Sequence, residues 1–160
     1  MEKFDLLTLG EVLLRLSPKE NKRIVRSMEF ESHVGGAELN VASGVSLLGL
    51  HTGIISKLPA NAIGELARSK VRSMNVSDDY LVWDHTEDAR LGSYFYESAT
   101  FPRKPQVVYD RKHSSITRIS IDEFPEEMYT STRCFHVSGI TLALCPEART
   151  CAVEMIKRFK

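Results

Sequence analysis

Two adjacent glycines and an asparagine form the first group of residues whose types and spacing could do chemistry. Gly35 and Gly36 precede a segment with helical periodicity, and Asn40 falls in its first turn. Glycines let a ligand approach the backbone, and the free amide groups at a helix start bind oxygen atoms or anions. The Asn40 side chain can hydrogen-bond a hydroxyl group. The alternative is a tight turn that only leads into a capped helix.

Two tyrosines and an arginine form the second group. Tyr109 and Arg111 are two positions apart in a segment typical of a strand, so their side chains share one face. Arginine can hold a carboxylate through two hydrogen bonds, and tyrosine can bond to a hydroxyl group or stack on a sugar. Tyr94 stands in an earlier aromatic segment that can pair with this one. The alternative is an exposed strand pair that only covers the core.

The third group, Ser138-Gly139-Ile140-Thr141, directly follows an apolar segment. Ligands bind beyond the carboxyl ends of strands in open α/β sheets, so this loop is a candidate as well as an ordinary connection. The five histidines and three cysteines do not have the spacing of metal ligands, so we expect no metal site. The glycine motifs typical of Rossmann folds and P-loops are missing from the sequence.

These groups need a framework, and hydrophobic periodicity predicts one. Apolar runs predict short buried strands at the positions 5–10, 52–56, 80–83 and 134–138. Apolar residues at three- and four-residue spacing predict helices at 38–48, 62–74 and 146–159. Strand–helix–strand units with short connections favour a parallel sheet, so the expected fold class is α/β.

Two regions interrupt this alternation, at about 12–32 and 90–112. The segments 91–97 and 106–111 are aromatic and β-branched with no helix between them, which predicts an antiparallel pair. In the earlier region, alternation over 23–31 predicts a half-exposed strand that forms a hairpin with 12–16. We expect both regions to form one small accessory sheet.

The composition excludes several classes of partner. The 160 residues contain 21 Lys and Arg against 21 Asp and Glu, so the formal net charge is zero. Binding to nucleic acids or anionic membranes relies on a basic excess, so we expect neither partner. No apolar run reaches the roughly 18 residues of a membrane span, and charges interrupt the N-terminal apolar stretch. Three cysteines without a C-x-x-C pair indicate free thiols and a cytoplasmic location.

The order of elements indicates an incomplete fold. The helix at 146–159 reaches the last residues, whereas a helix after a parallel strand normally leads to another strand. We therefore expect residues 1–160 to be the N-terminal part of one C-terminally truncated α/β domain.

Several motifs, in this order, resemble the ribokinase-like, or phosphofructokinase-B type, carbohydrate kinases. They are LTLGEVLLRLSP, VGGAELNVASGVSLLG and KLPANAIGE, although Pro59 and Asn61 replace the usual Gly and Asp in the last one. The sequence is most similar to 2-keto-3-deoxygluconate kinases. That similarity rests on GGAELNVA, Gly92-Ser93-Tyr94, Tyr109-Asp110-Arg111-Lys112 and HVSGITLAL.

This resemblance implies a three-layer α/β/α sandwich whose accessory sheet is a lid over a sugar. It implies sugar contacts from Gly36, Tyr94 and Tyr109, a carboxylate contact from Arg111, and a pocket wall at Ile140. Gly35 and Asn40 are added as neighbours of these residues. The lid is often a dimer contact in such kinases, so a homodimer through the lid sheet is expected.

The resemblance also implies what this chain does not carry. The family's general base is the Asp of a Gly-Ala-Gly-Asp motif in the C-terminal half, where ATP also binds, and the motif is missing here. We therefore expect no catalytic residue in this chain and no bound ATP or Mg²⁺. The full enzyme would transfer the ATP γ-phosphoryl group to a sugar-acid hydroxyl. The alternatives are a fructokinase or other sugar kinase, or a non-catalytic sugar-binding or dimerisation module.

Overall fold

A parallel sheet forms the centre of the structure, a computed structural model that describes residues 3–160. Its strand order is β5-β4-β1-β8, and every pairing is parallel. The strands are β1 (Leu6–Leu9), β4 (Thr52–Pro59), β5 (Val76–Asp84) and β8 (Phe135–Val137). The expected α/β fold is therefore confirmed.

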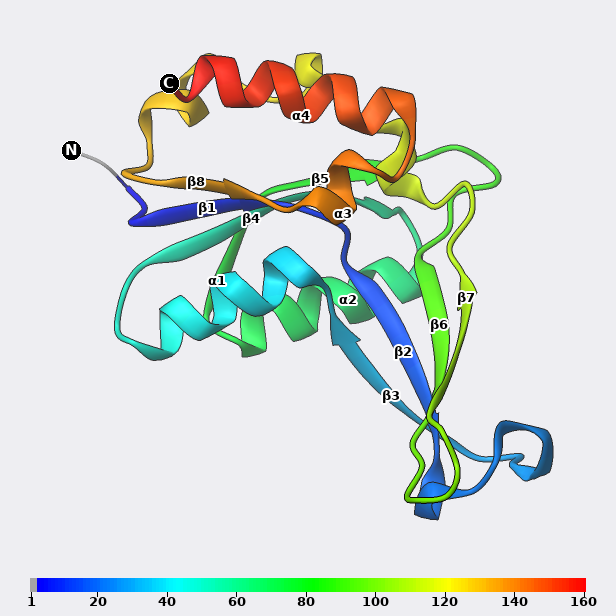
Figure 1. The fold of residues 1–160 in the computed structure, drawn as a ribbon. Coiled ribbons are helices and arrows are strands. Elements are labelled where there is room, and N and C mark those ends of the chain that lie inside the picture. Colours follow the sequence, from blue (N-terminus) through cyan, green and yellow to red (C-terminus); the bar gives the residue numbers. More distant parts are fainter. Residues whose placement is uncertain (1–2) are drawn as a thin grey trace.

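Helices cover both faces of this sheet and give the expected three layers (Figure 1). One face carries α1 (Ala37–Leu47) and α2 (Ala62–Ser73), and the other carries α4 (Pro146–Arg158). The short helix α3 (Gly139–Leu142) follows β8 directly. Among the described residues, none of the helices has the length and apolar character that crossing a membrane requires.

Local sequence signals explain where the helices begin and end. The side-chain oxygen of Asn61 accepts the amide hydrogens of Ile63 and Gly64 at 3.0 and 3.2 Å, which caps α2. Gly49 follows α1 with a φ of 86°, a conformation that favours glycine and ends the helix. Pro146 occupies the first turn of α4, where its missing amide hydrogen has no cost.

A second four-stranded sheet has the order β3-β2-β6-β7 and extends away from the parallel sheet (Figure 1). Its strands are β2 (Leu13–Pro18), β3 (Phe30–Gly35), β6 (Gly92–Glu97) and β7 (Gln106–Asp110). The β2–β3 and β6–β7 pairs are antiparallel, as predicted, and β2 joins β6 in parallel. The two interrupting regions thus form a single sheet.

The prediction of a strand over 23–31 is wrong for its first half. Ile24–Arg26 forms a 3₁₀ turn, and β3 begins only at Phe30. The amide of Ile24 donates to a side-chain oxygen of Glu97 at 2.9 Å, so this segment is anchored by a carboxylate and not by a strand ladder. Further 3₁₀ turns comprise η1 (Lys19–Asn21), η3 (Ser115–Arg118), η4 (Ile121–Glu123) and η5 (Glu126–Thr130).

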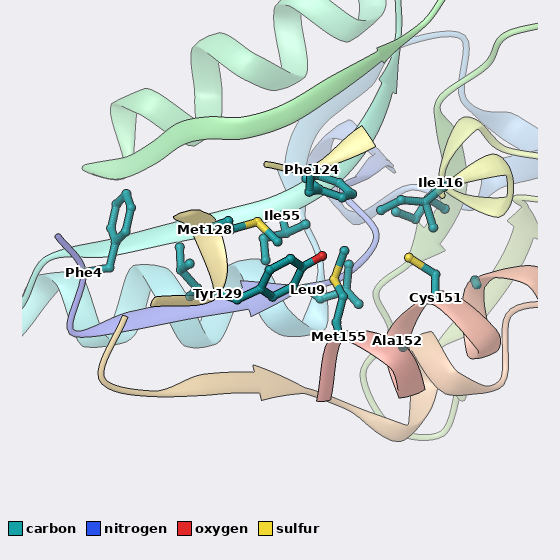
Figure 2. Packing of buried hydrophobic residues seen from close by; sticks show 13 residues of the cluster. Phe4, Leu9, Ile55, Ile116, Phe124, Met128, Tyr129, Cys151, Ala152 and Met155 are labelled. Atoms are coloured by element: carbon teal, nitrogen blue, oxygen red, sulfur yellow. The ribbon is translucent and has the colours of Figure 1, made fainter. Parts of the chain in front are cut away.

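Apolar side chains pack on both faces of the parallel sheet. Ile54 and Ile55 are adjacent in β4 and belong to different core clusters, as strand alternation requires. Ile55 packs in the cluster beneath α4, where Met155 is fully buried (Figure 2). Complete burial of such a side chain stabilises the fold by roughly 1.5–3 kcal/mol. The three cysteines are free.

Candidate functional site

Six of the seven predicted binding residues line one cavity of about 140 Å³. They come from α1, β6, the end of β7 and α3, which meet beside the parallel sheet. The six are Gly36, Asn40, Tyr94, Tyr109, Arg111 and Ile140. This volume is below the roughly 300–1,000 Å³ that most sites for drug-sized ligands occupy.

The first wall is the start of α1. Gly36 precedes the helix, and a Cβ atom there would lie 2.2 Å from the carbonyl oxygen of Glu11. Only glycine therefore fits without a backbone shift. Gly35 does not line the cavity. A Cβ atom on it would lie 3.4 Å from the side-chain oxygen of Asn40, which is ordinary van der Waals contact.

The second wall is aromatic and basic. Tyr94 and Tyr109 are directly paired across β6 and β7, and their ring centres are 5.6 Å apart. Arg111 lies just beyond β7, with its guanidinium carbon 5.7 Å from the centre of the Tyr109 ring. This distance permits a cation–π interaction, which positions the guanidinium group without consuming its hydrogen-bond donors.

Glu11 is a site residue that the sequence reasoning missed. Its Oε2 atom accepts a hydrogen bond from Nη2 of Arg111, and its Oε1 atom accepts one from the Ser114 hydroxyl at 2.6 Å. Burial raises the pKa of Glu11, Ser114 and Arg111 act in the opposite direction, and the nearby Glu38 raises it further. The position of Glu11 directly after an apolar strand was the available signal.

Glu38 is the second missed carboxylate, and it joins the third predicted group to the first. Its Oε1 atom accepts the Ser138 amide at 3.0 Å, the Ser138 hydroxyl at 2.6 Å and the Thr141 hydroxyl at 2.7 Å. These bonds fix the β8–α3 loop against α1 and thereby hold Ile140 at the cavity. Leu13 and Ala37 complete the lining.

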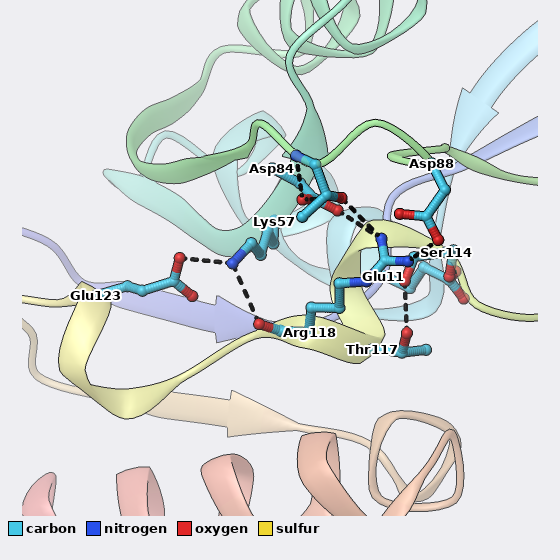
Figure 3. A network of polar contacts seen from close by, with 9 residues as sticks. Glu11, Lys57, Asp84, Asp88, Ser114, Thr117, Arg118 and Glu123 are labelled. Atoms are coloured by element: carbon cyan, nitrogen blue, oxygen red, sulfur yellow. Dashed lines mark hydrogen bonds and ion pairs between the residues drawn. The ribbon is translucent and has the colours of Figure 1, made fainter.

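A separate polar network anchors η3 near the ends of β4 and β5 (Figure 3). Asp84 accepts hydrogen bonds from the Thr86 amide and hydroxyl at 3.1 and 2.7 Å, and from Arg118 at 2.9 Å. Burial opposes ionisation of Asp84, but these bonds outweigh it and lower the pKa to about 2. Lys57 donates to Glu123 at 2.6 Å and to the Arg118 carbonyl at 3.1 Å.

A larger cavity of about 830 Å³ adjoins the first and shares Arg111 and Ile140 with it. Lys112, His113 and Arg118 add basic groups to its lining. Among residues 3–160, no cluster of three or more His, Cys, Asp or Glu side chains has the arrangement to hold a metal ion.

Comparison with known proteins identifies what this arrangement is similar to. The family described as "pfkB family carbohydrate kinase" matches residues 3–160. A 2-dehydro-3-deoxygalactonokinase of Haloferax volcanii is 36% identical over 153 residues, which cover 96% of this chain and 47% of that protein. The chain therefore spans about half the length of the curated relatives it matches.

Solved structures show the same relationship. The 2-dehydro-3-deoxygluconokinase of Thermotoga maritima superimposes with a TM-score of 0.89 at 37% identity, covering 95% of this chain and 46% of that one. An uncharacterized sugar kinase of Pyrococcus horikoshii, determined in complex with ATP, superimposes with a TM-score of 0.84 at 25% identity. That match covers 97% of this chain and 49% of the other.

Proposed function

Because this chain belongs to the pfkB family of carbohydrate kinases, we propose that it binds the sugar for a kinase that phosphorylates a sugar acid. The complete enzyme transfers the γ-phosphoryl group of ATP to a hydroxyl group of a substrate such as 2-keto-3-deoxygluconate. Two relatives named for 2-dehydro-3-deoxy sugar acids support this substrate class.

The observation that carries the proposal is the state of Arg111 in the small cavity. Glu11 occupies Nη2, while the Arg111 side chain as a whole is 21% exposed and lines the cavity. A guanidinium group has five N–H donors, so it can bind a second acceptor beside Glu11. A carboxylate matches the fork of an arginine better than a hydroxyl group does.

The other cavity residues suit the remainder of a sugar acid. The amide groups at the start of α1, beside Gly36 and Asn40, can bind hydroxyl or keto oxygens. Tyr94 and Tyr109 can bond to hydroxyl groups or lie against the sugar, and Ile140 supplies an apolar wall. We include Gly35 only as the neighbour of Gly36 in the sequence.

We place the catalytic base, ATP and Mg²⁺ outside these 160 residues, in a complete kinase of which this chain is the N-terminal part. Mg²⁺ would neutralise charge on the transferring phosphoryl group. The larger cavity beside Arg111 has basic groups that suit an approaching phosphate. On this view, the chain alone binds the sugar without phosphorylating it.

We also propose that the second sheet is a lid and that two copies pair through it. Its outermost strand, β7, exposes Val107 and Val108, which supports an interface there. Sedimentation should show a dimer in the unmodified protein and a monomer in Val108→Lys.

The free cysteines support a cytoplasmic location.

Binding calorimetry of two ligands tests the substrate class. We expect 2-keto-3-deoxygluconate to bind and Arg111→Ala to weaken it by about 30-fold or more, since a charge-assisted pair is worth about 2 kcal/mol. Arg72→Ala, which removes an exposed arginine of α2, is the matched control. Equal affinity for fructose in the wild type and in Arg111→Ala, with no acid preference, would instead support a neutral-sugar kinase.

A further inference from the structure

A buried carboxylate lies directly against the arginine that we assign to the ligand. Glu11 is only 4% exposed, and both of its oxygens are engaged, one by Arg111 and one by Ser114. Figure 3 shows Glu11 and Ser114 side by side. This ion pair neutralises Arg111 as long as no other anion binds.

Two glycines leave the space that Glu11 occupies. A Cβ atom on Gly92, at the start of β6, would lie 2.4 Å from Oε1 of Glu11, and one on Gly36 would lie 2.2 Å from its carbonyl oxygen. Glu11 lies in the connection from β1 to β2, and Ser114 lies in the connection from β7 to η3. The hydrogen bond between Glu11 and Ser114 therefore joins two connecting segments of the chain.

Few charged groups surround this pair. Besides Arg111, the charged residue that faces Glu11 is Glu38 of α1, which lines the same cavity. The segment after β7 also carries Lys112 and His113, which line the adjoining cavity. From β6, Gly92 contributes no side chain, and Tyr94 lines the same cavity. Burial and Glu38 both raise the pKa of Glu11, whereas Ser114 and Arg111 lower it.

We propose that Glu11 determines specificity for acidic ligands, because a ligand carboxylate binds Arg111 together with one proton that Glu11 takes up from the solvent. The inference rests on the proposed function, since it requires a carboxylate at Arg111. One guanidinium group cannot neutralise two ionised carboxylates in a buried site. With the proton on Glu11, the charges of the ligand carboxylate, Arg111 and Glu11 sum to zero.

This linkage fixes the direction of a pH effect. The ligand carboxyl stays ionised above pH 6, so it contributes no proton change. Above the pKa of Glu11 in the free protein, each pH unit weakens binding of the acid by up to about tenfold, because Glu11 must first gain a proton. Glutamine at this position keeps the shape and one acceptor oxygen but needs no proton.

Calorimetry with 2-keto-3-deoxygluconate between pH 6 and 9 tests the inference. Titrations in two buffers of different ionisation enthalpy count the protons taken up by the wild-type protein, without reliance on any variant. Glu11→Gln should bind without proton uptake and with a pH-independent Kd. His113→Asn should keep the slope, and asparagine suits the φ of 56° at position 113.

The expected result is a wild-type Kd that rises at least about tenfold across this range, and a flat profile in Glu11→Gln. A slope retained in Glu11→Gln, or lost only in His113→Asn, would overturn the inference. An equal loss of affinity at every pH in Glu11→Gln would reduce Glu11 to a structural role. Binding by the wild type without any slope overturns the inference alone, whereas no binding at any pH overturns the proposed function with it.

Discussion

Glu38 and Ser138 are 100 positions apart in the sequence, yet one oxygen of Glu38 accepts both the amide and the hydroxyl of Ser138, at 3.0 and 2.6 Å. The same oxygen also accepts the Thr141 hydroxyl at 2.7 Å. Glu38 lies in the first turn of α1, and Ser138 caps α3, so a single carboxylate holds two helix starts together. The cavity depends on this connection because it lies between them.

Removing the Glu38 carboxylate should therefore destabilise the fold and disturb the cavity. Glu38→Ala leaves the donors of Ser138 and Thr141 without an acceptor in a buried place, and we expect a loss of about 2–4 kcal/mol in the free energy of unfolding. Urea denaturation measures this loss. Glu65→Ala, which removes an exposed carboxylate from α2, is the control and should change stability by less than about 0.5 kcal/mol. Equal effects of the two variants would contradict the assigned role.

Gly36 and Gly44 should respond in opposite ways to alanine. At position 36 the new Cβ atom would lie 2.2 Å from the Glu11 carbonyl oxygen, so the backbone must shift and ligand affinity should fall by more than tenfold. At position 44, inside α1, nothing lies within 4 Å, and alanine should stabilise the helix by about 0.5–1 kcal/mol. Thermal unfolding and ligand titration of both variants check this contrast. Unchanged ligand affinity in Gly36→Ala would show that the close approach is not needed.

The strands and helices of the parallel sheet could be predicted because their signals are local. Leu39 and Ala42 of the predicted apolar stripe are buried in α1, although Leu48 at its end is 80% exposed. Asn61 caps α2 through atoms two and three residues away. The alternation at Ile24 and Met28 was misleading because Met28 is 96% exposed and Glu97, far along the chain, fixes that segment. Alternation of apolar and polar residues alone does not distinguish a paired β-strand from a turn that a distant side chain holds in place.

The cavity could be predicted only in pieces. Tyr109 and Arg111 share a strand face by their spacing, and Gly36 and Asn40 share a helix start. The side chains that join these pieces, Glu11 and Glu38, make their contacts with residues about 100 positions away. Glu11 meets Ser114 where the chain returns from the second sheet, and Glu38 meets Ser138 where β8 joins the parallel sheet, and no local pattern contains either contact.

Cys134 and Cys151 should differ in reactivity. Cys151 lies on the buried face of α4, and burial raises the pKa of its thiol to about 11, so very little thiolate exists at pH 8. Cys134 is exposed. Iodoacetamide at pH 8 should therefore modify Cys134 at least about tenfold faster, as mass spectrometry of peptides would show. Both should react at similar rates in urea, and equal rates in the native protein would contradict the burial of Cys151.

The network around Asp84 should make stability fall in strong acid. Its pKa is about 2 in the folded protein against 3.8 ordinarily, so the ionised form stabilises the fold above pH 4. As the pH falls from about 4 to 2, the unfolded chain binds a proton that the native chain resists, and about 2 kcal/mol is lost. Urea midpoints at pH 2.5, 4 and 6 measure this loss, which Asp84→Asn should remove.

Asp88 provides the matched control for Asp84, because both carboxylates pair with Arg118. The side chain of Asp88 is 74% exposed, whereas that of Asp84 is 2% exposed. Solvent screens the exposed pair, so Asp88→Asn should change stability by less than about 1 kcal/mol and leave the acid dependence intact. If Asp88→Asn removed that dependence and Asp84→Asn preserved it, the exposed carboxylate would be the one that holds η3 in place.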